Sequence, residues 1–102
     1  MGYFHLKLVS PRPTFPFDIT EAEGKAMAEH SVYWQRLAGD GHAVAIGPVF
    51  DPRGPYGLAI VETENEAEAE AFGAADPIVK AGLGFRYEVA PMPSIILREP
   101  KD

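Results

Sequence analysis

Four short β-type stretches and two helix-type stretches follow one another along this chain in the order β-α-β-β-α-β. The β-type stretches alternate in polarity or run apolar, and they cover residues 3–9, 43–50, 56–61 and 85–90. This order predicts an α+β architecture with a four-stranded antiparallel sheet and both helices packed on one face. A chain of 102 residues has room for one domain, which we expect to span residues 1–102.

Local signals predict where each helix begins and ends. Thr20 with Glu23 forms a capping box before the first helix, and Asn65 with Glu68 forms the same motif before the second. Gly39 is expected to end the first helix, because glycine is favoured at helix C-termini.

The packing of several segments can also be predicted. The strand at 43–50 is continuously apolar, which is typical of burial on both faces. In the second helix we expect Ala67, Ala71 and Phe72 to point inward. The three prolines of residues 10–17 exclude a regular helix or a central strand there and predict a stiff loop.

One face of the predicted sheet has no element of this chain to cover it. Uncovered apolar faces usually mark interfaces. A symmetric homodimer that stacks two sheets is the simplest arrangement, and we expect one.

Composition and charge narrow the classes of function. The chain has no cysteine, which excludes disulfides, thiolate catalysis and zinc–thiolate sites. The net charge of −6 and the scattered basic residues argue against nucleic acid as a partner. No apolar run approaches the roughly 18 residues of a membrane span, and the N-terminus lacks the pattern of a secretory signal. We therefore expect a cytoplasmic protein that binds neither nucleic acid nor membrane.

A histidine lies on the apolar stripe of the first helix. Met27, His30, Trp34 and Leu37 are spaced by three, four and three residues, which places them on one face. A buried imidazole without a hydrogen-bond partner costs about 1–3 kcal/mol, whereas the near-neutral pKa of free histidine suits proton transfer. His30 is therefore either a core residue bonded to a backbone carbonyl or a functional group.

Asp76 can act structurally, functionally or in both ways. Asp followed by Pro77 is typical of an N-cap with proline at N1, here before a short helical turn that ends near Gly82. The carboxylate could also face His30, fixing the tautomer of the ring and stabilising the imidazolium. One oxygen can cap while the other accepts from the ring, so the two roles are compatible.

Other residues are candidates for binding a small molecule. Trp34 and Tyr33 could contact a substrate beside His30. Gly47 and Pro48 interrupt the second strand, either as a simple kink or as an opening that admits a ligand. The three histidines lack the spacing of metal ligands, so we expect no metal site and no other cofactor.

Several motifs occur in a fixed order over nearly the whole chain. They are His30 in a helix eleven residues before Gly41, Gly47-Pro48, a glycine-containing hairpin at 54–57, Glu66-Ala67-Glu68-Ala69, Asp76-Pro77 with Ala81-Gly82, and a closing strand that ends near Pro91-Met92. Together they resemble the YciI-like (YCII-related) domain family. The proline-rich loop at 10–17 is longer than the family pattern.

The resemblance implies the dimeric α/β-barrel version of the ferredoxin-like fold. It also implies a His–Asp pair in a pocket between helix and sheet, which maps onto His30 and Asp76. A related member is a dehydrochlorinase of a hydroxylated, chlorinated aromatic ring, so the resemblance implies lyase chemistry.

These observations favour a small cofactor-independent enzyme. His30 and Asp76 would carry out elimination or isomerisation on a small, aromatic or enolisable substrate. A non-catalytic module that binds a small ligand or a partner protein is the alternative. A cofactor-free monooxygenase is a third hypothesis, and it rests on fold analogy alone.

Overall fold

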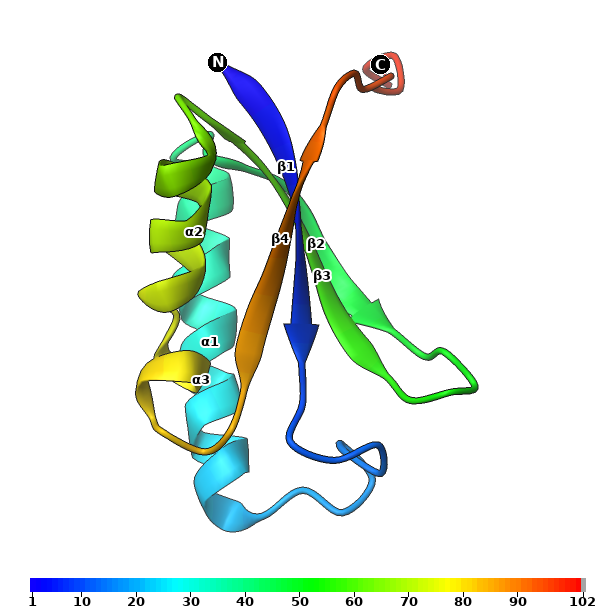
Figure 1. Ribbon diagram of the computed structural model, residues 1–102, viewed down its shortest axis with the longest axis vertical. Helices are drawn as coiled ribbons and strands as arrows, with labels where there is room; N and C mark the ends of the chain where they lie inside the picture. Colours follow the sequence, from blue (N-terminus) through cyan, green and yellow to red (C-terminus); the bar gives the residue numbers. More distant parts are fainter. Residues whose placement is uncertain (102) are drawn as a thin grey trace.

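The computed structural model describes residues 1–101, and its elements follow the predicted order. The strands are β1 (Gly2–Val9), β2 (Ala43–Val49), β3 (Tyr56–Thr63) and β4 (Arg86–Met92), and the helices are α1 (Glu21–Gly39), α2 (Glu66–Ala74) and the short α3 (Pro77–Lys80). The strands pair antiparallel in the order β2-β3-β1-β4. Figure 1 shows all three helices on one side of this sheet, which confirms the predicted fold class.

Hydrogen bonds at the helix starts match the sequence signals closely. The Thr20 hydroxyl accepts from the Glu23 N–H at 3.1 Å, and the Glu23 carboxylate accepts from the Thr20 N–H at 2.9 Å. This capping box is therefore confirmed. The Asn65 side chain caps α2 at 2.9 Å, but the Glu68 carboxylate accepts from the N–H of Glu64 instead of Asn65. The second box is thus only half formed.

The core lies between the helices and the sheet. Phe4, Leu6 and Leu8 alternate along β1 and are all buried, so their face of the strand points toward the helices. The cluster around Phe4 and Leu6 includes Trp34 and residues of β3 and α2. The cluster around Leu8 lies at the other end of β1, where the candidate site begins.

The prediction that β2 is buried on both faces is wrong. β2 is an edge strand, and Val44, Ala45 and Ile46 are exposed. An edge strand has a neighbour on one side only, and β2 contacts α1 through part of its length. Its apolar character is explained instead by Ile46, Gly47 and Pro48, which line a cavity.

The prediction for α2 is wrong for Ala67 and Ala71, which lie two positions away from the buried residues, and is confirmed for Phe72, which packs against the core. Ala69 and Gly73 are the buried residues of this helix, Phe72 is half-buried, and Ala67 and Ala71 are exposed. A Cβ atom at position 73 would lie 3.0 Å from Cδ2 of Tyr87. The helix approaches β4 so closely at this point that only glycine fits without a shift.

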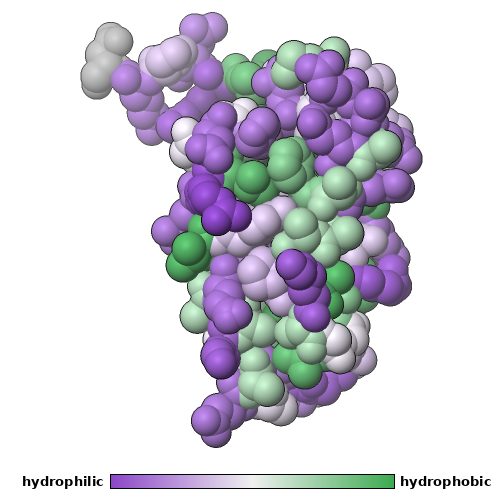
Figure 2. All heavy atoms as spheres, turned by 90° about the vertical axis from the view of Figure 1, so that its left-hand side faces the viewer, coloured by the Kyte–Doolittle hydropathy of each residue, from purple (hydrophilic) through white to green (hydrophobic). Residues whose placement is uncertain are grey.

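The two outer faces of the molecule differ in character. The helix side is mainly hydrophilic, with apolar residues in a paler band along its middle (Figure 2). On the opposite face, register places His5 beside Ile60 and Lys7 between Leu58 and Glu88. That sheet face mixes apolar and charged residues, whereas the sequence predicted a mainly apolar one.

Candidate active site

His30 of α1 and Asp76 at the start of α3 are in direct contact. The ring atom Nδ1 lies 2.7 Å from Oδ2 of the carboxylate, although the residues are 46 positions apart. Asp76 is also the N-cap of α3, because its Oδ1 accepts from the Ile78 N–H at 3.0 Å. The two carboxylate oxygens therefore make the capping bond and the ring bond separately.

Oδ2 of Asp76 accepts from two further side chains. The Trp34 indole N–H lies at 2.7 Å and the Tyr87 hydroxyl at 2.5 Å. The indole N–H also lies 3.1 Å from the Tyr87 oxygen, so it is shared between the two acceptors. Asp76 has no exposed surface, and its charge is balanced by donated hydrogen bonds instead of water.

These contacts determine the charge state of the site. Burial raises the pKa of Asp76, but hydrogen bonds from His30, Tyr87 and the Ile78 N–H outweigh burial and leave the pKa below its usual value. Burial and the neighbouring Asp76 charge raise the pKa of the Tyr87 phenol well above its usual value. At neutral pH Asp76 is therefore a carboxylate and Tyr87 a neutral donor.

The charge state also determines the tautomer of His30. A carboxylate has no proton to donate, so the His30 Nδ1 must carry the hydrogen of their shared bond. In the neutral ring, the Nε2 lone pair is then free to accept a proton. The side chain is 13% exposed, so a small molecule in the adjoining space can reach it.

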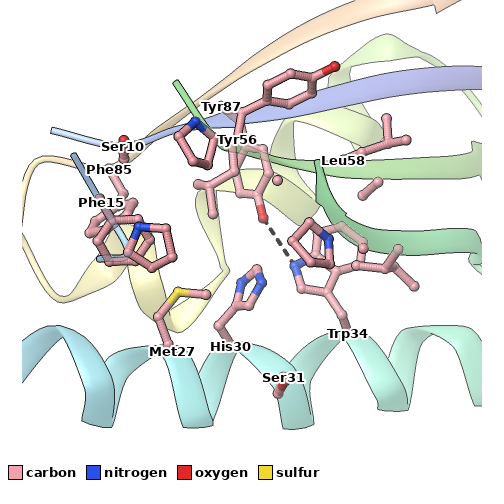
Figure 3. A pocket seen from close by; sticks show the side chains of 18 of the residues that line it. Ser10, Phe15, Met27, His30, Ser31, Trp34, Tyr56, Leu58, Phe85 and Tyr87 are labelled. Carbon is pink, nitrogen blue, oxygen red and sulfur yellow. Dashed lines mark hydrogen bonds between the residues drawn. The ribbon is translucent and has the colours of Figure 1, made fainter. Parts of the chain in front are cut away.

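A cavity of about 470 Å³ adjoins the imidazole between α1 and the sheet. Figure 3 shows the His30 ring rising from α1 into this space, with Met27 on one side and Trp34 on the other. Apolar side chains form most of the wall: Leu8, Phe15, Pro16, Met27, Trp34, Ile46, Pro48, Phe50 and Phe85. A volume of this size suits a small organic molecule.

Three of the four predicted binding residues line the cavity, and the fourth lies elsewhere. Trp34, Gly47 and Pro48 line the cavity. Tyr33 does not, because its hydroxyl donates to the Phe72 carbonyl at 2.6 Å, between α1 and α2. The residue next to Trp34 is rotated by about 100° around an α-helix, so both rings could not face the same space.

The proline-rich loop after β1 forms one end of the cavity. Phe15 is buried, lines the cavity and packs edge-on against Phe85 with ring centroids 4.9 Å apart. Arg12 holds the loop by donating to both oxygens of the buried Glu23 at 2.6 and 2.7 Å and to Asp18 at 2.9 Å. Arg12 thus links the start of the loop both to its end at Asp18 and to the first turn of α1.

Tyr87 and Arg12 are the residues of this region that sequence reasoning missed. Alternation in β4 could have placed Tyr87 on the helix-facing side, beside Val89, but nothing local indicates its bond to Asp76. Among residues 1–101, no group of three metal-ligating side chains occurs. In the same part of the chain, no helix combines the length and apolarity that crossing a bilayer requires.

The fold and the His–Asp contact define a ferredoxin-like α+β protein with a polar pair beside an apolar cavity. The sequence profile of the YCII-related domain matches residues 4–93, and the chain belongs to this family. No curated protein matches the chain.

Among solved structures, the chain is similar to the 5-chloro-2-hydroxyhydroquinone dehydrochlorinase of Burkholderia phenoliruptrix AC1100, in complex with 2,5-dihydroxybenzoquinone. The sequences are 20% identical, the TM-score is 0.53, and the match covers 85% of this chain and 90% of that chain. At this identity the likeness supports the shared fold alone.

Proposed function

We propose that this protein is a small enzyme in which His30 acts as general base and general acid, and Asp76 positions its ring. The observation that carries the proposal is the 2.7 Å contact between Nδ1 and Oδ2, because it leaves Nε2 free beside a cavity. Because a protein of the same fold is a dehydrochlorinase, elimination is the reaction class that we propose to test first.

The proposed step needs one proton acceptor and one bound molecule. Nε2 of His30 takes a proton from an acidic O–H or C–H group of a small aromatic or enolisable substrate. In an elimination, the released electron pair forms a double bond and a leaving group such as chloride departs from a neighbouring carbon. In an isomerisation, the imidazolium returns the proton at another atom. Asp76 stabilises the imidazolium in both cases.

The test measures proton transfer and leaving-group release with purified protein. Chlorinated hydroquinones are followed by chloride release, and enolisable ketones by deuterium incorporation from D₂O. His30→Gln should lower the rate by about 10²–10⁴-fold. His42→Gln is the matched control, because His42 packs against Phe72, and it should leave the rate unchanged. Equal rates for His30→Gln and wild type would overturn the proposal.

The alternative is a binding module with the same cavity. That alternative predicts ligand binding in wild type and in His30→Gln, with no chloride release or deuterium incorporation in either protein. The mainly apolar wall of the cavity is compatible with this role.

We also propose that two copies associate through the helix-free sheet face. Tyr3, His5 and Lys7 are half-buried on this face of one chain. Light scattering after size-exclusion chromatography should give twice the 11.1 kDa chain mass, and replacing His5 with Glu should weaken the dimer. A monomer at all concentrations would contradict this. The cytoplasmic location and the extent of the domain over residues 1–102 stay predictions.

A further inference from the structure

The wall of the large cavity carries no formal charge apart from the one that His30 can acquire. None of the cavity-lining residues within the described range 1–101 is Lys, Arg, Asp or Glu. In the chain as a whole, 24% of residues are charged. A bound ligand would therefore meet no fixed countercharge on the wall.

The polar atoms of the wall are largely bonded to the protein already. The Trp34 N–H and Tyr87 hydroxyl are directed to Asp76, and the Ser10 hydroxyl donates to the Arg12 carbonyl. Ser31 and Gln35 are exposed residues of α1. In the described chain, Nε2 of His30 makes no hydrogen bond to protein, so it is a polar atom available to a ligand, and the other unbonded polar side chains of the lining, those of Ser31, Gln35 and Tyr56, are uncharged.

The cations of an adjoining hollow, which shares Ser10, Pro55 and Tyr56 with the cavity wall, are also engaged elsewhere. Arg12 donates to Glu23 and Asp18, and Arg53 donates to Asp51. The Lys7 ammonium lies 4.7 Å from the centroid of the Tyr56 ring, on the helix-free side of β1. An anion that entered the cavity would therefore lose part of its hydration without gaining a cationic partner as long as His30 is neutral.

Asp76 adds a second reason for rejecting anions. Its carboxylate is fully buried directly behind the His30 ring and is ionised at neutral pH. Two negative charges separated by one imidazole repel each other strongly where water is excluded. An uncharged acid avoids this repulsion, because the proton it gives to Nε2 creates an imidazolium between the two charges.

From these observations we propose that the cavity selects an uncharged, mostly apolar molecule with its one acidic O–H or C–H group at His30, and that it rejects carboxylates, sulfonates and phosphate esters. The inference rests on the proposed function in taking this cavity as the binding site of a proton donor. It adds the charge class of the substrate.

The test compares two ligands of nearly equal shape at pH 8. The ligands are 4-(hydroxymethyl)phenol, which is uncharged, and 4-hydroxybenzoate, which is a carboxylate. Trp34 is the single tryptophan of the chain and lines the cavity, so its fluorescence and indole N–H resonance report binding. The uncharged ligand should bind about tenfold or more tightly than the carboxylate.

A charge variant tests the cause of the selectivity. Ile46 lies on the cavity wall and is 38% exposed, so Ile46→Lys places a cation at the rim and should reduce the affinity ratio. Val44→Lys is the matched control, because Val44 is 40% exposed on the same strand but does not line the cavity, and it should keep the ratio.

Three outcomes would overturn the inference. The first is equal binding of both ligands by wild type, and the second is an unchanged affinity ratio in Ile46→Lys. The third is no binding of either ligand at about 50 mM, a concentration at which even a millimolar Kd gives near-saturation. Failure of the proposed function is recognised separately. If charge selectivity is found but His30→Gln keeps the wild-type rate of proton transfer, the cavity selects neutral ligands without His30 catalysis.

Discussion

Tyr87 and Asp76 are joined by a 2.5 Å hydrogen bond, in which the phenol donates to the same oxygen that accepts from His30. The raised pKa of Tyr87 means that this phenol keeps its proton at neutral pH. The bond connects β4 to the start of α3, so that Oδ2 of Asp76 is held by donors from both α1 and β4. Tyr87 is therefore a positioning residue in the proposed mechanism.

Removal of this hydroxyl tests that role. Tyr87→Phe keeps the ring packing but leaves Asp76 with one hydrogen-bond donor fewer. The free energy of unfolding should therefore fall by about 1–2 kcal/mol. The pKa of Asp76 should rise, because a bond that lowers it is lost. Activity should fall by less than in His30→Gln. Urea denaturation and NMR titration of the Asp76 carboxyl carbon measure both effects. An unchanged Asp76 pKa would show that the bond does not stabilise the charge.

The glycines of α1 and α2 should respond oppositely to alanine. A Cβ at Gly73 would lie within 3.0–3.3 Å of three Tyr87 atoms, so Gly73→Ala should destabilise the fold by about 1–3 kcal/mol. A Cβ at Gly24 of α1 would meet no neighbouring side chain or element within 4 Å, so Gly24→Ala should stabilise by about 0.5–1 kcal/mol. Thermal unfolding of both variants measures the effects. A stable Gly73→Ala protein would contradict the close approach of α2 to β4.

The Arg12 contacts should control the order of the loop at residues 10–18. Arg12→Lys removes the planar fork that binds both Glu23 oxygens, so the Phe17 N–H, which donates to the Thr14 carbonyl, should exchange faster with solvent. Arg53→Lys is the control. It changes a similar pair at a side chain that is 91% exposed and should have little effect. Equal exchange in the two variants would mean that Arg12 does not hold the loop.

Acid should destabilise the protein through two buried carboxylates. Hydrogen bonds from Arg12 lower the pKa of Glu23 to about 2, and the pKa of Asp76 is lowered as described above. A depressed native pKa gives stability that is present above the unfolded-state pKa, about 4, and is lost as pH falls through the native value. The free energy of unfolding should therefore fall between about pH 5 and pH 2. Glu23→Gln and Asp76→Asn should each make the free energy of unfolding depend less steeply on pH. An unchanged pH dependence in either variant would show that the replaced carboxylate does not cause the loss of stability in acid.

Local sequence signals were sufficient to predict the order of the strands and helices, and the positions of His30 and Asp76 within their own elements. The Thr20 capping box and the Asp76 N-cap depend on residues two or three positions apart, and both formed as predicted. The 3.6-residue period placed His30 and Trp34 on one face of α1. The contact between His30 and Asp76 required the family resemblance, because nothing local relates residues 46 positions apart.

The errors share a cause in tertiary packing. The apolar sequence of β2 is that of a central strand, yet its residues line a cavity at the sheet edge. Periodicity predicts Ala67, Ala71 and Phe72 on the inward face of α2, and only Phe72 packs against the core. Gly73 faces the sheet instead of Ala71, at a point where Tyr87 leaves no room for a side chain. Such contacts depend on the neighbouring element and not on periodicity.

The tautomer of His30 decides whether the proposed proton transfer can operate. Nitrogen-15 NMR of the imidazole distinguishes a ring protonated at Nδ1 from one protonated at Nε2, with His30→Gln used for assignment. We predict that neutral His30 carries its proton on Nδ1 in wild type, and that this preference is lost in Asp76→Asn. A wild-type ring protonated at Nε2 would contradict the mechanism, because the nitrogen facing the cavity could not then accept a proton.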